Sequence, residues 1–175
     1  MLVSDPKLLN ALPLTTAAVK ESMRLFPAAS TTRTTVPNHP LQTVTFNNQT
    51  LPLAGQQIWV AHYGFGQREE LWPEPRKFKL DRFLPGAPQV KDAWRPFEKG
   101  PRGCLGLELA MMEIKLVLVL LMREFDFEIA YAPDAPRAPP EHGVAGGRGY
   151  QIVEFAAKPV GHMPMRVRRR DKFGS

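Results

Sequence analysis

The sequence predicts a mainly helical fold with small β-sheets, an α+β arrangement in one domain over residues 1–175. In residues 105–127, apolar side chains recur at steps of three and four, which is the period of a helix. Residues 31–63 are instead rich in β-branched residues between Pro, Asn-Asn and Ala-Gly turns, a pattern typical of short antiparallel strands. A further helix is expected over residues 15–26, because Pro27 ends it.

The composition narrows the class of protein. The chain has 175 residues and is 43% hydrophobic, enough for one globular domain with a sizeable core. Its 23 Lys and Arg exceed its 17 Asp and Glu, and the net charge of +6 favours an acidic partner, an anionic ligand or a membrane surface. The single Cys excludes an intrachain disulfide and fits a reducing compartment. No segment resembles a signal peptide or reaches the roughly 20 apolar residues of a membrane span.

The other elements follow from local signals. Thr15 or Thr16 is the expected N-cap of the first helix. Residues 64–103 form a long loop, and its aromatic side chains indicate that it is packed and ordered. The helix over 105–127 is apolar nearly all round in its second half, which predicts burial. Strand-like segments in residues 150–168 precede a basic end, which is interpreted as a solvated tail and not as a nucleic-acid surface.

Cys104 lies in a loop, FEKGPRGCLG, that spans residues 97–106. Lys99, Arg102 and the start of the long helix would stabilise a thiolate, and the glycines leave room for a large flat group. From the residues alone, Cys104 could be a nucleophile, a metal ligand or an inert buried residue. The four histidines show no signature spacing to Cys104, and the paired ligands of a zinc site are missing. Sole ligation of iron in a macrocycle is the ligand role that remains.

Three motifs carry a resemblance to a known family. FEKGPRGCLG resembles the heme-binding loop of the cytochrome P450 superfamily, and Glu21-Ser-Met-Arg24 resembles its Glu-x-x-Arg helix motif. WPEPRKFKLDRF, between them, is similar to the segment that supplies a further arginine. The motifs occur in the family's order, so the whole chain is identified as similar to the C-terminal, heme-ligating part of such a protein. The loop matches the family's fixed positions at Phe97, Gly100, Arg102, Cys104 and Gly106.

The resemblance implies a role for each loop residue. Cys104 would be the axial thiolate ligand of the iron in heme b, iron protoporphyrin IX. Phe97 would pack beside the sulfur and screen it from solvent. Arg102 would pair with a heme propionate, and Arg33 is a further candidate for that task. No residue of this chain is assigned a separate catalytic role. The cofactor-binding loop also includes Gly100 and Gly106.

A second set of residues would be structural. Glu21 and Arg24 are three apart, so a helix brings both side chains to one face, where they could also be an ordinary exposed pair. The resemblance implies instead a buried ionic triad of Glu21, Arg24 and Arg82 that fixes the cysteine loop. The segment around Arg82 reads LDRF and lacks the Pro-Glu that is usual in the family.

The resemblance also implies a function. The parent would be a heme-dependent monooxygenase, an oxidoreductase that inserts one oxygen atom of O₂ into a small, lipophilic organic substrate. NADPH-cytochrome P450 reductase would donate the electrons, and nucleic acid is not an expected partner. The long helix looks like that of filamentous-fungal microsomal members, so the parent is expected at the cytosolic face of the endoplasmic reticulum membrane. Two alternatives stay open: a non-catalytic heme-binding fragment, and a heme-thiolate isomerase that rearranges a peroxide.

The chain is also expected to be truncated. Family members carry an acid and a threonine on a distal helix, and no segment before Glu21 resembles it, nor an N-terminal membrane anchor. The chain alone would then lack monooxygenase turnover and would fold poorly or aggregate, and residues 116–121 would face water or another chain. Substrate is expected near residues 28–32 and a turn within 143–149.

Overall fold

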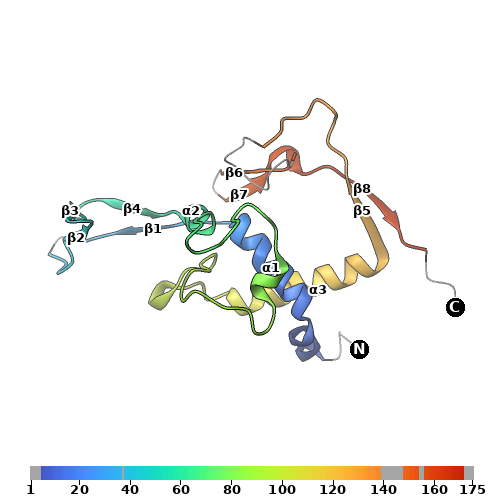
Figure 1. The fold of residues 1–175 in the computed structure, drawn as a ribbon, viewed down its shortest axis with the longest axis horizontal. Helices are drawn as coiled ribbons and strands as arrows, with labels where there is room; N and C mark the ends of the chain where they lie inside the picture. Colours follow the sequence, from blue (N-terminus) through green and yellow to red (C-terminus); the bar gives the residue numbers. More distant parts are fainter. Residues whose placement is uncertain (1–4, 37, 139–147, 154–155, 172–175) are drawn as a thin grey trace.

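The computed structural model describes residues 5–36, 38–138, 148–153 and 156–171. Two helices, α1 (Pro13–Leu25) and α3 (Leu107–Glu124), pack against each other near the centre of an elongated molecule (Figure 1). An arm of strands extends to one side of them, and a two-stranded ribbon lies on the other side (Figure 1). The other helical elements are α2 (His62–Gly66) and the 3-10 helices η1 (Pro6–Ala11), η2 (Leu80–Phe83), η3 (Gly100–Arg102) and η4 (Val160–His162).

The strands form four separate antiparallel pairs. In the arm, β1 pairs with β4 and β2 pairs with β3, so the small sheet expected over 31–63 is divided into two. Asn47 and Asn48 both have positive φ, 48° and 60°, which suits a tight hairpin turn between β2 and β3. The strands are β1 (Thr31–Thr34), β2 (Thr43–Phe46), β3 (Gln49–Pro52), β4 (Gln57–Val60), β5 (Phe125–Ile129), β6 (Gln151–Val153), β7 (Ala157–Pro159) and β8 (Met165–Arg169).

The first helix starts earlier than predicted. α1 begins at Pro13, because a proline ring presets the φ of the first helical turn and lacks only an N–H that would be unpaired there. Thr15 and Thr16, the expected caps, therefore lie inside the helix, and Leu12 occupies the N-cap position without a side-chain hydrogen bond. The predicted strand after residue 60 is also corrected: His62–Gly66 forms α2, where two glycines disfavour an extended strand.

The long helix is shorter than predicted at both ends. α3 covers Leu107–Glu124, and Phe125–Ile129 forms β5 instead of the last helical turn. The sequence FDFEI alternates in polarity, and β8 offers it a partner strand, so a period of two wins over the helical period. The ribbon of β5 and β8 places Asp126 opposite Arg168 and Glu128 opposite Arg166, with charged atoms 3.6 and 3.9 Å apart.

The second half of α3 is not buried as predicted. Val117, Leu120 and Leu121 are 50%, 47% and 41% exposed. The face of α3 that packs inward is earlier in the helix, at Met111 and Lys115. The exposure agrees in part with the expectation that residues 116–121 meet water or another chain. No helix of the described part is long and apolar enough to cross a bilayer. The buried apolar side chains are Leu9, Ala17, Val19, Leu25, Trp72, Ala93 and Met111.

Polar substitutions on this exposed face should improve solubility at little cost to stability. We expect Val117→Lys with Leu120→Glu to reduce light scattering at high protein concentration, because both side chains are about half exposed. The unfolding free energy should change by less than about 0.5 kcal/mol per site. In contrast, Leu25→Ala removes a fully buried side chain and should cost about 2–5 kcal/mol in urea unfolding. Scattering unchanged by the polar pair would contradict this assignment of the face.

Candidate functional site

The loop before α3 folds back on itself and presents Cys104. The Cys104 backbone N–H donates to the Phe97 carbonyl (2.8 Å), and the Gly103 N–H donates to the Gly100 carbonyl (2.9 Å). Gly100 has φ 75°, a left-handed conformation that glycine adopts without strain. Gly106 is the N-cap of α3, so the helix begins three residues after the thiol, at Leu107. Cys104 itself is exposed.

An open cavity of about 440 Å³ lies against this loop. Phe97, Arg102 and Cys104 all line it, so the structure brings together the predicted sulfur ligand, its aromatic neighbour and a cation. Gly100, Gly106 and Arg33 are not among its lining residues. The other walls come from α1, the segment after it, α2, the loop and α3: Met23, Ala28, Ala29, Ser30, Thr31, His62, Pro96, Glu98, Ala110 and Ile114.

This donor set fits a large, flat metal cofactor with acidic substituents. Cys104 offers a soft sulfur ligand, and Arg102 offers a guanidinium that can bind a carboxylate in bidentate fashion. Ala110 and Ile114 give one turn of α3 an apolar surface beside the sulfur. Small side chains in residues 28–31 also line the cavity, and substrate is expected near these residues.

The predicted triad meets as a buried network on α1. Glu21 is fully buried and Arg24 is 2% exposed. The Arg24 Nε and Nη2 groups donate to the two Glu21 carboxylate oxygens at 2.7 Å each, a bidentate pair. Arg82 Nε, from η2, donates to Glu21 Oε1 at 3.2 Å, and the Lys79 backbone N–H donates to the same oxygen at 2.9 Å. The Glu21 carboxylate therefore has a donor on each oxygen.

The two arginines also bind the backbone of the long loop. Arg24 Nη1 donates to the carbonyls of Gly66 (2.5 Å) and Pro75 (2.7 Å). Arg82 Nη2 donates to the carbonyls of Pro73 (2.7 Å) and Glu74 (2.9 Å). The triad thus binds residues 66–79 to α1, although these two segments are far apart in the sequence.

A row of aromatic rings leads from the triad to the cysteine loop. Trp72, over which Arg24 stacks, lies 5.6 Å from Phe83 between ring centroids. Phe83 lies 6.4 Å from Trp94, and Trp94 lies 5.9 Å from Phe97 at the cavity wall. The Trp94 indole N–H also donates to the carbonyl of α1 residue Lys20 at 2.9 Å. The loop is therefore held on α1 by ring packing and by a hydrogen bond.

Glu98 and His62 belong to the site, although the sequence reasoning did not select them. His62 Nε2 lies 3.1 Å from Glu98 Oε1, and both residues line the cavity. Arg33, predicted to bind a propionate, instead donates Nη2 to Glu98 Oε2 at 2.8 Å. Burial lowers the pKa of His62, an effect that Glu98 partly offsets and that Arg95 and Arg33 reinforce. In the sequence, the one indication of this contact is the position of an acidic residue, Glu98, inside the cysteine loop.

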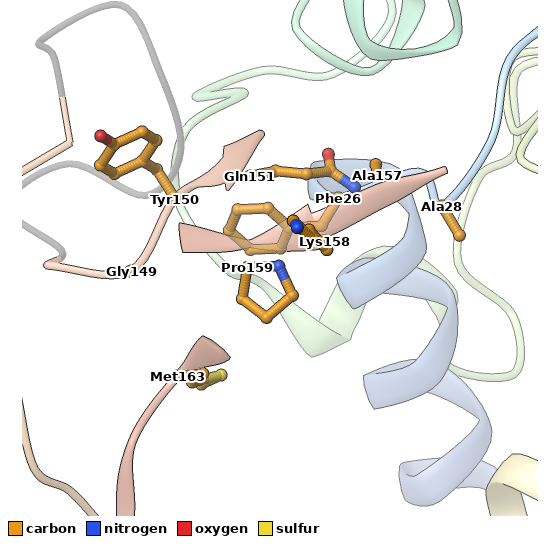
Figure 2. A pocket seen from close by; sticks show the side chains of 9 residues that line it. All are labelled: Phe26, Ala28, Gly149, Tyr150, Gln151, Ala157, Lys158, Pro159 and Met163. Atoms are coloured by element: carbon orange, nitrogen blue, oxygen red, sulfur yellow. The ribbon is translucent and has the colours of Figure 1, made fainter. Parts of the chain in front are cut away.

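A second cavity of about 320 Å³ adjoins the end of α1 (Figure 2). The β6–β7 hairpin forms one wall and is bound to the segment after α1: Gln151 Nε2 donates to the Pro27 carbonyl, and the Ala157 N–H donates to the Ala28 carbonyl, each at 2.8 Å. Ala28 lines both cavities. Gly149 also lines the second one, whereas most of the predicted 143–149 turn lies outside the described residues.

Comparison with known proteins identifies the family. The cytochrome P450 family model matches residues 5–149. The chain belongs to the cytochrome P450 family. Cytochrome P450 monooxygenase PC-23 of Penicillium crustosum is 41% identical over 174 residues, which are 98% of this chain and 83% of that protein. Monooxygenase ptmG of Penicillium ochrochloron is also 41% identical over 174 residues, but these cover 31% of its length.

Solved P450 structures share the fold. The retinoic acid-bound cyanobacterial CYP120A1 superposes with a TM-score of 0.74 at 22% identity, over 93% of this chain and 34% of that one. The heme domain of cytochrome P450DA gives 0.75 at 21% identity, over 95% and 33%. The predicted family and the α+β P450 fold are therefore confirmed, and membership implies heme as the cofactor. The chain spans about a third of these structures and of ptmG.

Loss of the Glu21 charge should destabilise the folded chain. Glu21→Gln leaves two arginines without their carboxylate in a buried site, which we expect to cost about 3–5 kcal/mol of unfolding free energy. Urea unfolding followed by circular dichroism measures this. Glu70→Gln is the matched control, because its pair with Arg68 is more than half exposed and should contribute nothing measurable. Equal stability of the two variants would contradict a buried role for Glu21.

His62 should make stability depend on pH. Because its pKa is lowered by folding, the unfolded chain binds more protons, and the unfolding free energy should fall as pH decreases below about 6.5. His62→Gln should remove this part of the dependence in urea unfolding measured between about pH 5.5 and 8. His39→Gln, in an exposed loop, should leave it in place. An unchanged pH profile for His62→Gln would refute the assignment.

Proposed function

We propose that this chain is the heme-ligating part of a cytochrome P450 monooxygenase, with Cys104 as the protein ligand of the heme iron. The observation that carries the proposal is the exposed Cys104 thiol on the wall of a cavity of about 440 Å³, beside Phe97 and Arg102. Bound heme supplies the iron at which O₂ is activated and one oxygen atom is inserted into an organic substrate.

Each residue of the loop has a task in this proposal. Cys104 binds as a thiolate and donates electron density. Phe97 lines the same cavity as Cys104 and is itself held by Trp94 at a centroid separation of 5.9 Å. Arg102 pairs with a heme carboxylate at the cavity wall. Gly106 keeps one side of the sulfur open, since a Cβ there would lie 3.8 Å from Cys104 Sγ.

The remaining predicted residues act around the heme. Gly100 permits the left-handed turn of the loop. Glu21, Arg24 and Arg82 hold the loop that carries Cys104 through the aromatic row. Arg33 contacts Glu98 and would have to release it to bind a heme carboxylate directly.

The substrate and the electron donor follow from the same surfaces. Just after α1, Ala28 lines both cavities and Phe26 lines the second, which supports a small, lipophilic substrate there. Exposed Lys91, before the cysteine loop, and exposed Lys99, within it, suit an acidic donor such as NADPH-cytochrome P450 reductase. For the parent protein, the proposal includes the endoplasmic reticulum location that the resemblance of the long helix to fungal microsomal members implies.

A heme-binding role without turnover is the second candidate. The cavity is open, and Leu105, next to Cys104, is fully exposed, so heme would bind and dissociate more readily than in an enclosed site. Oxygenated product from substrate, NADPH and reductase supports the monooxygenase. Heme binding without product supports the second candidate, and rearrangement of a peroxide without NADPH supports an isomerase.

Ligation by Cys104 is testable by spectroscopy. We expect the chain, purified with heme and reduced under carbon monoxide, to show the red-shifted Soret band of thiolate ligation. Cys104→Ser should abolish that shift, because a serine hydroxyl does not supply a thiolate. Met112→Leu, at an exposed position of α3, should keep it. A red-shifted band retained in Cys104→Ser would refute the ligand assignment.

A further inference from the structure

The Glu98 carboxylate joins three segments around the large cavity. Its Oε2 accepts from Arg33 Nη2 of β1 at 2.8 Å, and its Oε1 lies 3.1 Å from His62 Nε2 of α2. Arg95 Nη2, from the loop itself, lies 3.6 Å from the same Oε1. The side chains of Glu98 and His62 are only 9% and 4% exposed. The carboxylate and the imidazole are therefore largely withdrawn from solvent, whereas Arg33 and Arg95 are 37% and 28% exposed, and a charge-assisted hydrogen bond to a buried carboxylate is among the stronger ones.

The partners of Glu98 are themselves fixed in place. Arg33 Nη1 donates to Thr31 Oγ1 at 2.7 Å and to the Thr32 carbonyl at 3.0 Å, so its guanidinium spans from β1 to the loop. Arg95 stacks over the ring of Phe65 in α2 at 5.5 Å. His62 Nδ1 is buried without a hydrogen-bond partner among the described residues, so none of these holds the imidazole by that nitrogen.

The backbone of Glu98 gives independent support. Glu98 has φ 62°, a left-handed conformation that a residue with a Cβ rarely adopts. Such a conformation persists where the surroundings hold it, and it is common at functional sites. Glu98 directly follows Phe97, whose carbonyl accepts the Cys104 N–H at 2.8 Å. Glu98, with its left-handed backbone, is thus the neighbour of the residue whose carbonyl accepts the hydrogen bond that closes the cysteine loop.

We propose that Glu98 is a positioning residue, which holds β1 and α2 against the cysteine loop and so gives the cavity its heme-binding shape. Arg33 then acts through Glu98 and not on the cofactor directly. The inference rests on the proposed function. The alternative role makes the opposite prediction. If Glu98 instead held Arg33 away from a heme carboxylate, removing the Glu98 side chain would strengthen heme binding.

Hemin titration of the 175-residue chain tests the proposal. Glu98→Gln keeps the size of the side chain and removes its charge, and we expect the hemin Kd to rise about tenfold. Arg33→Gln should have a similar effect, and the double variant should be little worse than either, because both remove the same contact. Glu98→Asp should restore part of the affinity. Glu70→Gln, an exposed ion-paired glutamate, is the control and should bind hemin normally.

The pKa of His62, measured by NMR in the heme-free chain, reports on the contact itself. Glu98 raises that pKa by its charge and its hydrogen bond, so Glu98→Gln should lower it further. An unchanged pKa would overturn the proposal, because the contact would be absent. A lowered pKa with equal or tighter hemin binding would also overturn it, because the contact would not position the site.

The two proposals can fail separately. The proposed function fails if Cys104→Ser keeps the thiolate-shifted Soret band, whatever Glu98 does. The positioning role fails if the Glu98 variants bind hemin like the unmodified chain while Cys104→Ser loses that band. Should Glu98→Gln not fold, Arg33→Gln provides the same comparison, because it removes the contact from its more exposed partner.

Discussion

The burial of one carboxylate, that of Glu21, is the constraint on which the architecture depends. A charge removed from water is tolerated only when donors surround it, and here Arg24, Arg82 and the Lys79 backbone supply them. The remaining donors of the two arginines bind main-chain carbonyls between residues 66 and 75. A long loop without regular structure can therefore take one shape, because its backbone groups complete the solvation of a buried ionic network.

Aromatic side chains connect the buried ionic network to the cavity. Their rings pack in a row from Trp72 to Phe97, and Trp94 adds a hydrogen bond to α1. Glu98 then connects the loop to β1 and α2. The position of Cys104 thus depends on contacts from several distant parts of the chain. A helix start alone would not determine it.

The parts of this arrangement that sequence reasoning could predict are local or tied to a motif. Glu21 and Arg24 were expected to pair because a helix spaces them so, and the cysteine loop was identified by its residues. The end of α3 was missed because Phe125, four residues after Leu121, continues the helical period, and only pairing with β8 decides for a strand. Glu98 was missed because its partner Arg33 is 65 residues away, and no local pattern encodes such a contact.

The aromatic row also makes the site its own optical probe. Two of the three tryptophans, Trp72 and Trp94, belong to it, and Trp94 packs on Phe97 at the cavity wall. An indole this near a porphyrin transfers its excitation energy to the porphyrin. Heme bound in the cavity would therefore quench the intrinsic tryptophan fluorescence of the chain. Trp59, 64% exposed on β4 of the arm, emits from a wetter environment at longer wavelength. The folded chain therefore carries a sensor of cofactor occupancy without any added label.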